Sequence, residues 1–231
     1  MKELVLPSVN RPFVEALHQV ADTAGTWSVI GGFAVWCHIG ESHRPTLDID
    51  TAAASEAHET LVALGAPGDS DHRRIVEGVK LEIIEVLDPG PEASGLDDKN
   101  RLFVTAHWAA ARLTTHVQVR CEDLEVTVPV ARRLPLVACK LHAWLDRRDQ
   151  RAEKRGSDGL DIVRLLQTAD WDAMVADASE IGKLAEVVEW AGERVLVEQA
   201  AKVVRLIQVH TDESPATPDD VLGLGRLLCS V

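Results

Sequence analysis

The hydrophobic pattern of this chain changes near residue 130, and this change constrains the fold more than any other feature. Before it, short apolar runs such as 26–30 and 79–87 alternate with turn residues and helix-like stretches, which is typical of strands and helices mixed along the chain. After Pro135 the strand signals stop and apolar residues recur at helical spacing. We therefore predict an α+β region over 1–130 followed by a helical C-terminal domain over 131–231.

Individual elements follow from the same periodicity and from the turn residues between the runs. The predicted strands are 26–30, 46–52, 79–87, 117–119 and 124–128, the last two forming either a hairpin or two separate short strands. Helices are predicted after Asn10, after Gly32 and after Ser55, and then over 136–148, 160–166, 181–190 and 195–209, with a short one after Pro218. The segment 92–100 is expected to be a loop.

Composition excludes several classes of protein. The chain has 231 residues, of which 46% are hydrophobic, as expected of a globular protein. No apolar run reaches the roughly 20 residues of a membrane-spanning helix, and the start of the chain lacks the apolar stretch of a secretion signal. The four cysteines, Cys37, Cys121, Cys139 and Cys229, are far apart in sequence, which favours reduced thiols over a zinc site or a disulfide framework. We expect a cytoplasmic protein without a membrane partner.

The charge of the chain is negative but unevenly distributed. The formal net charge is −13, which disfavours general binding to nucleic acid. Between residues 131 and 155, however, Lys and Arg outnumber Asp and Glu, whereas acidic residues predominate on both sides. This basic belt is either a solvated helix face or a surface that receives phosphates.

The most informative stretch is 30–50, where two glycines precede a pair of acids. Gly31-Gly32 ends a predicted strand and starts a predicted helix. The two glycines form either a tight turn without a ligand or a turn in which the first amides of the helix bind phosphate. Asp48 and Asp50 are two residues apart in a predicted strand and therefore point to the same face. Two adjacent carboxylates repel each other unless a divalent cation lies between them, and Mg²⁺ prefers such oxygen ligands.

Gly31-Gly32 followed by Arg44-x-Thr46-x-Asp48-Ile49-Asp50 resembles the signature of the nucleotidyltransferase superfamily with a polymerase-β-like core. The resemblance implies a mixed sheet with flanking helices. It implies that Gly31, Gly32, Arg44 and Thr46 bind a nucleoside triphosphate (NTP), and that Asp48 and Asp50 bind Mg²⁺. For Arg44 the alternative is that it fixes the loop by pairing with Asp48.

A third carboxylate usually comes from a later strand of this family, and Glu85 is the candidate here. Its phase puts it in the otherwise apolar row of Leu81 and Ile83, where a charge needs a partner. A polar residue at a sheet edge is the alternative. Glu in place of the more usual Asp is a departure from the family pattern.

Two charged residues of the C-terminal part extend the resemblance. Lys140 lies on one helix face with Leu136 and Trp144, so its charge either reaches water or requires an anion, for which a triphosphate is suitable. Asp161 falls in the first turn of its helix if Asp158 is the N-cap, where the helix dipole alone favours an acid. Together with the arginine-rich turn at 147–148, this pattern resembles the AbiEii-type toxins of type IV toxin–antitoxin systems. It implies that Lys140 contacts phosphates and that Asp161 positions the acceptor or a base.

The sequence therefore predicts a Mg²⁺-dependent nucleotidyltransferase with Asp48, Asp50, Lys140 and Asp161 as catalytic residues. The resemblance implies RNA as acceptor, specifically a tRNA 3′ end, with growth arrest as the outcome and an antitoxin as partner. An aminoglycoside-type enzyme that modifies a small cationic molecule is one alternative, because the acidic helices after residue 156 would attract a cationic substrate. A nucleotide-binding domain without turnover is the other.

Overall fold

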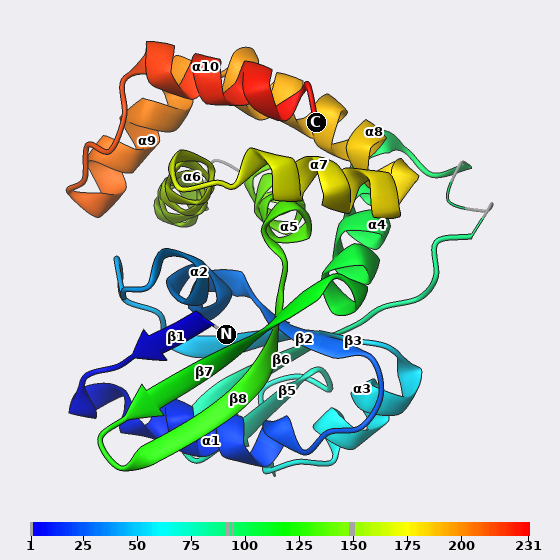
Figure 1. The fold of residues 1–231 in the computed structure, drawn as a ribbon, viewed down its shortest axis with the longest axis vertical. Helices are drawn as coiled ribbons and strands as arrows, with labels where there is room; N and C mark the ends of the chain where they lie inside the picture. Colours follow the sequence, from blue (N-terminus) through cyan, green and yellow to red (C-terminus); the bar gives the residue numbers. More distant parts are fainter. Residues whose placement is uncertain (1, 91–92, 94, 148–150) are drawn as a thin grey trace. The chain divides into compact units, whose positions relative to one another are not determined.

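The computed structural model describes residues 2–90, 93, 95–147 and 151–231 (Figure 1). Across these residues no helix combines the length and the apolar character that a membrane span requires. Arg148, which was expected to be part of the arginine-rich turn, lies outside the described residues.

The chain divides into two compact units. Unit 1 comprises Met1–Asp88 and Ala110–Arg132, and unit 2 comprises Pro89–Ala109 and Arg133–Val231. The sequence placed a single boundary near residue 130. In the structure a segment of the N-terminal part, Pro89–Ala109, belongs with the C-terminal helices, so the chain passes between the units three times.

Unit 1 is built on one mixed sheet of eight strands in the order β1-β7-β8-β2-β3-β6-β5-β4 (Figure 1). Strands β1 and β7, β2 and β8, and β3 and β6 pair in parallel, and the other neighbours are antiparallel. The strands are β1 (Lys2–Val5), β2 (Trp27–Ile30), β3 (Asp48–Ala53), β4 (Ala66–Pro67), β5 (Arg73–Val76), β6 (Val79–Glu85), β7 (Thr114–Cys121) and β8 (Leu124–Ala131).

The burial of these strands follows their position in the sheet. All four residues of β2, a central strand, are buried, as its continuous apolar run indicates. Along β6, by contrast, Val79, Leu81 and Ile83 are buried and the residues between them are half-buried, which is the alternation of a strand with one covered face. Strand β3 lies between β2 and β6, so its acids occupy the interior of the sheet rather than an edge.

The helices of unit 1 are the short η1 (Ser8–Asn10), α1 (Arg11–Ala21), α2 (Gly31–Ile39) and α3 (Ser55–Val62). Two of them, α1 and α2, meet through aromatic rings. The ring of Phe33 on α2 lies 5.6 Å from the ring of Phe13 on α1 and 5.6 Å from that of Trp36. Such ring contacts contribute about 1 kcal/mol each beyond the area they bury, and they hold α2 in place at the end of β2.

Unit 2 is helical. Its helices are α5 (Arg133–Asp146), α6 (Ala152–Gln167), α7 (Trp171–Glu180), α8 (Gly182–Gly192), the π-helical turn η4 (Glu193–Val197), α9 (Ala200–Thr211), α10 (Pro218–Leu228) and most of α4 (Asp98–Arg112). Helices α6 and α9 approach closely at Gly156, where a Cβ atom would lie only 2.6 Å from the Leu206 carbonyl oxygen.

The prediction of an α+β chain with a mixed set of strands and helices is confirmed, with strands at or near each of the predicted positions. The condition under which Asp161 would lie in a first helical turn, with Asp158 as the N-cap, is not met, because α6 begins at Ala152 and Asp158 lies within it. The sequence also gave no indication of β1, of the β4–β5 hairpin or of helix α7. Of the expected loop over 92–100, residues 92 and 94 lie outside the described residues, and the prediction is wrong from Asp98 onward, where α4 begins.

Within unit 2, His107 on α4 is buried among aromatic rings. Its ring lies 4.4 Å from that of Phe103 and 6.0 Å from that of His142, and its Nδ1 lies 2.8 Å from the Phe103 carbonyl oxygen. Burial lowers the pKa of His107 to about 4 and also lowers the pKa of His142.

This burial predicts a loss of stability in acid. The unfolded chain binds a proton at His107 near pH 6.5, whereas the folded chain does so only near pH 4. The stabilisation is therefore complete above pH 6.5 and is lost as the pH falls to 4, by about 3 kcal/mol. Urea unfolding at several pH values should show a shallower decline for His107→Gln than for the wild type. The exposed His116, changed to Gln, is the control, and equal declines in all three proteins would contradict the prediction.

Candidate active site

The turn between β2 and α2 is a point of close approach to an acid. Gly31 has a φ of +69°, a conformation that L side chains rarely adopt. A Cβ atom built on Gly31 would overlap the carboxylate of Asp50, which therefore lies directly against the turn. On the next residue, Gly32, a Cβ would lie 2.9 Å from both Arg44 Nη2 and Thr46 Oγ1. The two glycines are thus where three of the predicted site residues converge.

Strand pairing explains why Asp50 reaches the turn. Strand β3 runs antiparallel to β2, with Asp50 opposite Ile30, the residue that precedes Gly31. Asp48 and Asp50 are both half-buried, whereas Ile49 between them is 1% exposed. The two carboxylates therefore share one face of the sheet beside the glycine turn, while Ile49 belongs to the core on the other face.

The loop that precedes β3 is tied down by local hydrogen bonds. Trp36 Nε1 of α2 donates to the Arg44 carbonyl oxygen at 3.1 Å, and Thr46 Oγ1 donates to Asp48 Oδ1 at 3.3 Å. Thr46 is buried, whereas Leu47 is 83% exposed. These bonds hold the guanidinium of Arg44 and the hydroxyl of Thr46 near the first turn of α2, where unpaired amides and the helix dipole favour an anion.

Glu85 does not join the two acids. In the parallel pairing of β3 with β6, Glu85 lies opposite Ala53, whereas Glu82 lies opposite Asp50. Because side chains alternate along a strand, Glu85 also points to the other face from Asp48 and Asp50. The assignment of Glu85 as a metal ligand is therefore corrected, and Glu82 is the carboxylate of β6 that shares the face of the two aspartates.

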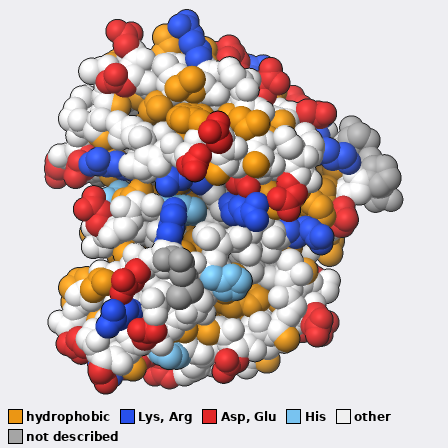
Figure 2. Space-filling model, viewed as in Figure 1, with side chains coloured by type: hydrophobic (Ala, Val, Ile, Leu, Met, Phe, Trp, Pro, Cys, Tyr) orange, Lys and Arg blue, Asp and Glu red, His pale blue; other side chains and the backbone are white. Residues whose placement is uncertain are grey.

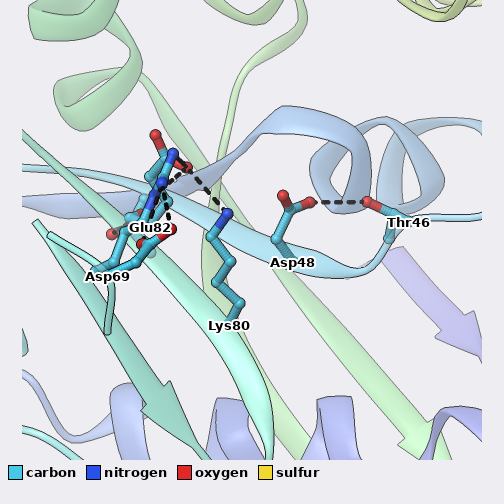
Figure 3. A network of polar contacts seen from close by, with 7 residues as sticks. Thr46, Asp48, Asp69, Lys80 and Glu82 are labelled. Atoms are coloured by element: carbon cyan, nitrogen blue, oxygen red, sulfur yellow. Dashed lines mark hydrogen bonds and ion pairs between the residues drawn. The ribbon is translucent and has the colours of Figure 1, made fainter. Parts of the chain in front are cut away.

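Glu82 is held by basic residues of neighbouring positions (Figure 3). Arg73 on β5 places Nε and Nη2 each 3.2 Å from Glu82 Oε2, and Lys80 Nζ lies 3.9 Å from the same oxygen. Arg73 also binds both carboxylate oxygens of Asp69 at 3.0 and 3.1 Å, which lowers the pKa of Asp69. Glu82 thus lies on the sheet face of the aspartates, while its carboxylate is paired with Arg73 of β5.

The close approach at Gly31 gives a direct prediction. Gly31→Ala should strain the backbone by about 1–2 kcal/mol and should in addition displace the Asp50 carboxylate. Gly40→Ala is a matched control, because Gly40 has a φ of +83° but its Cβ would meet nothing within 4 Å. In urea unfolding we expect Gly31→Ala to lose at least about 1 kcal/mol more than Gly40→Ala. Equal losses would show that Asp50 is not packed against the turn.

Unit 2 holds the second set of predicted residues in a buried ion cluster. Lys140 Nζ on α5 lies 2.8 Å from Asp161 Oδ2 and 3.6 Å from Asp158 Oδ1, both on α6. Arg147 Nε binds Asp158 Oδ2 at 2.5 Å. The side chains of Lys140, Asp158 and Asp161 are 9%, 4% and 0% exposed, whereas that of Arg147 is 27% exposed, so three of the four charged groups are almost out of contact with water.

This cluster decides between the alternatives for Lys140 and Asp161. Lys140 does not reach water, because the anion that its position requires is supplied by Asp161 and Asp158. Asp161 lies in the middle of α6 rather than in its first turn, so the helix dipole does not account for it. Both residues are held by their mutual charge, and they belong to a different unit from the aspartates of β3.

Most of the basic belt is engaged within the protein. Arg133 binds the Leu165 carbonyl and Thr168 Oγ1, Arg147 binds Asp158, and the guanidinium of Arg155 lies 4.7 Å above the centre of the Trp144 ring. Arg151 and Lys154 are exposed. Figure 2 shows acidic side chains interspersed with basic ones over the visible face. The belt is therefore mainly structural, with a small exposed part.

The donor set of unit 1 suits magnesium bound together with a substrate. The described residues contain no ready-made group of three or more His, Cys, Asp or Glu side chains for a metal. Mg²⁺, however, is commonly held by one or two carboxylates, several waters and substrate phosphates. Asp48 and Asp50 on one face beside a phosphate-type turn satisfy that requirement, with Glu82 as a further carboxylate on the same face.

The cysteines take no part in either cluster. All four are free, and Cys37 and Cys139 are buried. Burial raises the pKa of each of these two thiols to about 12, so both remain protonated and unreactive at neutral pH.

Comparisons of the chain with family models, with curated proteins and with solved structures find no match. A function therefore has to be inferred from the side chains of the two units. Sequence reasoning missed Glu82, Lys80 and Asp158 as members of these clusters. The alternation of residues along β6 places Lys80 and Glu82 on the same face. Only the register with β3 shows that this is also the face of Asp48 and Asp50.

Proposed function

We propose that this chain is a Mg²⁺-dependent nucleotidyltransferase that moves a nucleoside monophosphate from an NTP to a hydroxyl group. The observation that carries the proposal is the contact of the Asp50 carboxylate with Gly31. A metal-binding acid and a phosphate-type turn at one point are what a metal–triphosphate complex requires. The resemblance of the 31–50 motif to the nucleotidyltransferase superfamily supports the same reaction.

The residues of unit 1 have distinct parts in this proposal. The amides after Gly31 and the side chains of Arg44 and Thr46 bind the phosphate chain, and Asp48 and Asp50 hold the cation. Magnesium, when bound, neutralises charge that develops on the phosphates. The acceptor oxygen forms a bond to the α-phosphorus, the bond to the bridging oxygen of the β-phosphate breaks, and pyrophosphate leaves with that electron pair. A carboxylate of the pair takes the hydroxyl proton or passes it to water.

The part of unit 2 is proposed from the resemblance to AbiEii-type toxins. On that pattern Lys140 contacts phosphate, and Asp161 positions the acceptor or a base. The ion pair between them gives each a fixed position within its unit. A ligand phosphate would have to compete with Asp161 and Asp158 for the ammonium of Lys140, so we place the main nucleotide contacts in unit 1.

The acceptor we propose is RNA, in particular a tRNA 3′ end, in the cytoplasm. The consequence would be growth arrest, with a cognate antitoxin as partner. The exposed Arg151 and Lys154 are the local basic contacts that this acceptor would use, since the chain as a whole carries a charge of −13.

A small cationic acceptor, as in aminoglycoside nucleotidyltransferases, is a second candidate. It is favoured by the net charge and by the engagement of Arg133, Arg147 and Arg155 within unit 2, which leaves little of the basic belt for RNA. An acidic protein attracts a polycation and repels a polyanion, so the two candidates predict opposite acceptors.

The test is transfer of label from each α-labelled NTP, with Mg²⁺, to total tRNA or to a panel of aminoglycosides. Label in tRNA supports the first candidate, and label in the small molecule supports the second. Binding of an NTP without transfer to either acceptor would favour a nucleotide-binding domain without turnover. Absence of both binding and transfer would overturn the proposal.

A further inference from the structure

The sheet face that carries the two aspartates also carries a lysine. In the parallel pairing of β3 with β6, Lys80 is the partner of Asp48, as Glu82 is of Asp50. Partnered residues of neighbouring strands present their side chains on the same face. Figure 3 shows Lys80 extending over this face between Glu82 and Asp48.

Lys80 is held weakly by the acid to which it is paired. Its Nζ is 3.9 Å from Glu82 Oε2, whereas two nitrogens of Arg73 lie 3.2 Å from that same oxygen. The charge of Glu82 is therefore neutralised mainly by Arg73. The side chain of Lys80 is 35% exposed, so its ammonium can be reached from solvent.

We propose that Lys80 is a substrate-binding residue whose ammonium contacts the phosphate chain of an NTP beside Asp48 and Asp50. The inference rests on the proposed nucleotidyl transfer and adds a residue to its site. A triphosphate brings more negative charge than one divalent cation neutralises, and a flexible ammonium next to the metal-binding acids supplies the missing positive charge.

The same position has a consequence for the cation. In the nucleotide-free protein the ammonium of Lys80 lies on the face of Asp48 and Asp50 and opposes the entry of a second positive charge. The phosphates of an NTP remove this opposition by binding Lys80 themselves. The divalent cation therefore enters together with the nucleotide rather than before it.

The test compares Lys80→Met, Lys80→Arg and the wild type in their affinity for each NTP and for the corresponding monophosphate, with Mg²⁺. Loss of one charge-assisted contact should weaken NTP binding about tenfold in Lys80→Met. The monophosphate affinity should change much less, and Lys80→Arg should keep most of the NTP affinity. Lys2→Met on β1, which changes an exposed lysine of the same sheet four strands from β3, is the control.

A second measurement, binding of Mn²⁺ to the nucleotide-free protein by electron paramagnetic resonance, should show tighter binding in Lys80→Met than in the wild type.

A purely structural lysine would leave the ratio of NTP to monophosphate affinity unchanged, and that result overturns the inference. If wild-type protein transfers label but Lys80→Met binds NTP normally, the Lys80 inference alone fails. If wild-type protein binds NTP without transferring it, the proposed reaction fails while the Lys80 contact is still measured. If it binds no NTP, both fail.

Discussion

Asp48→Asn and Asp50→Asn should each reduce the proposed nucleotidyl transfer at least about a hundredfold, because each would remove an anionic ligand from the cation that we propose stabilises the reacting phosphates. The fold should survive, since the substitution is nearly isosteric and reduces the repulsion between two carboxylates on one face of β3. The measurement is label transfer at saturating Mg²⁺, together with urea unfolding of the same samples.

Asp22→Asn is the matched control, because Asp22 is an exposed acid of unit 1 at the end of α1. It should keep full transfer activity. Activity that persists in both Asp48→Asn and Asp50→Asn would show that the metal assignment is wrong, whatever the acceptor.

The second large effect is on stability. Lys140→Met should lower the free energy of unfolding by about 3–5 kcal/mol, because it removes the ammonium that lies 2.8 Å from the fully buried carboxylate of Asp161. Adding Asp161→Asn to this variant should restore a large part of the loss, since no uncompensated buried charge then faces residue 140. Urea unfolding at pH 7 provides the comparison.

An ion pair of equal length in the same unit is the control. Lys99 Nζ lies 2.8 Å from Asp146 Oδ1, but these side chains are 42% and 57% exposed. Lys99→Met should therefore cost less than about 1 kcal/mol. A similarly small cost for Lys140→Met would mean that water reaches Lys140. If the Lys140→Met/Asp161→Asn protein folds stably, label transfer can be measured in it. A loss of transfer would then reflect a role of Lys140 and Asp161 in the proposed reaction rather than a loss of stability.

The sequence predicted that Gly31 and Asp50 lie close together, and the structure places them so because Gly31 directly follows β2 and Asp50 lies on β3, the next strand along the chain, which pairs with β2. It could not distinguish Glu82 from Glu85, because both are on β6 and only the register with β3 shows which one faces the aspartates. That register depends on residues about 30 positions apart and is not encoded in local periodicity.

Two other failures have physical reasons of their own. Helix α4 was not predicted because its buried face consists largely of alanines, among them Ala106 and Ala109, which give only a weak hydrophobic period. The part of Asp158 in the ion cluster of Lys140 was missed because Asp158 was considered as a helix cap, whereas α6 begins at Ala152 with no side-chain cap. Tertiary packing, rather than local preference, decides both cases.

The three passages of the chain between its units determine how it can be dissected. A fragment that stops at Arg132 would retain every strand but would also carry Pro89–Ala109, whose apolar side chains, such as Leu102, pack in a core supplied by later helices. Such a fragment would expose those side chains and tend to aggregate. No single cut in the chain therefore separates the two units, and the glycine turn is best studied in the intact polypeptide.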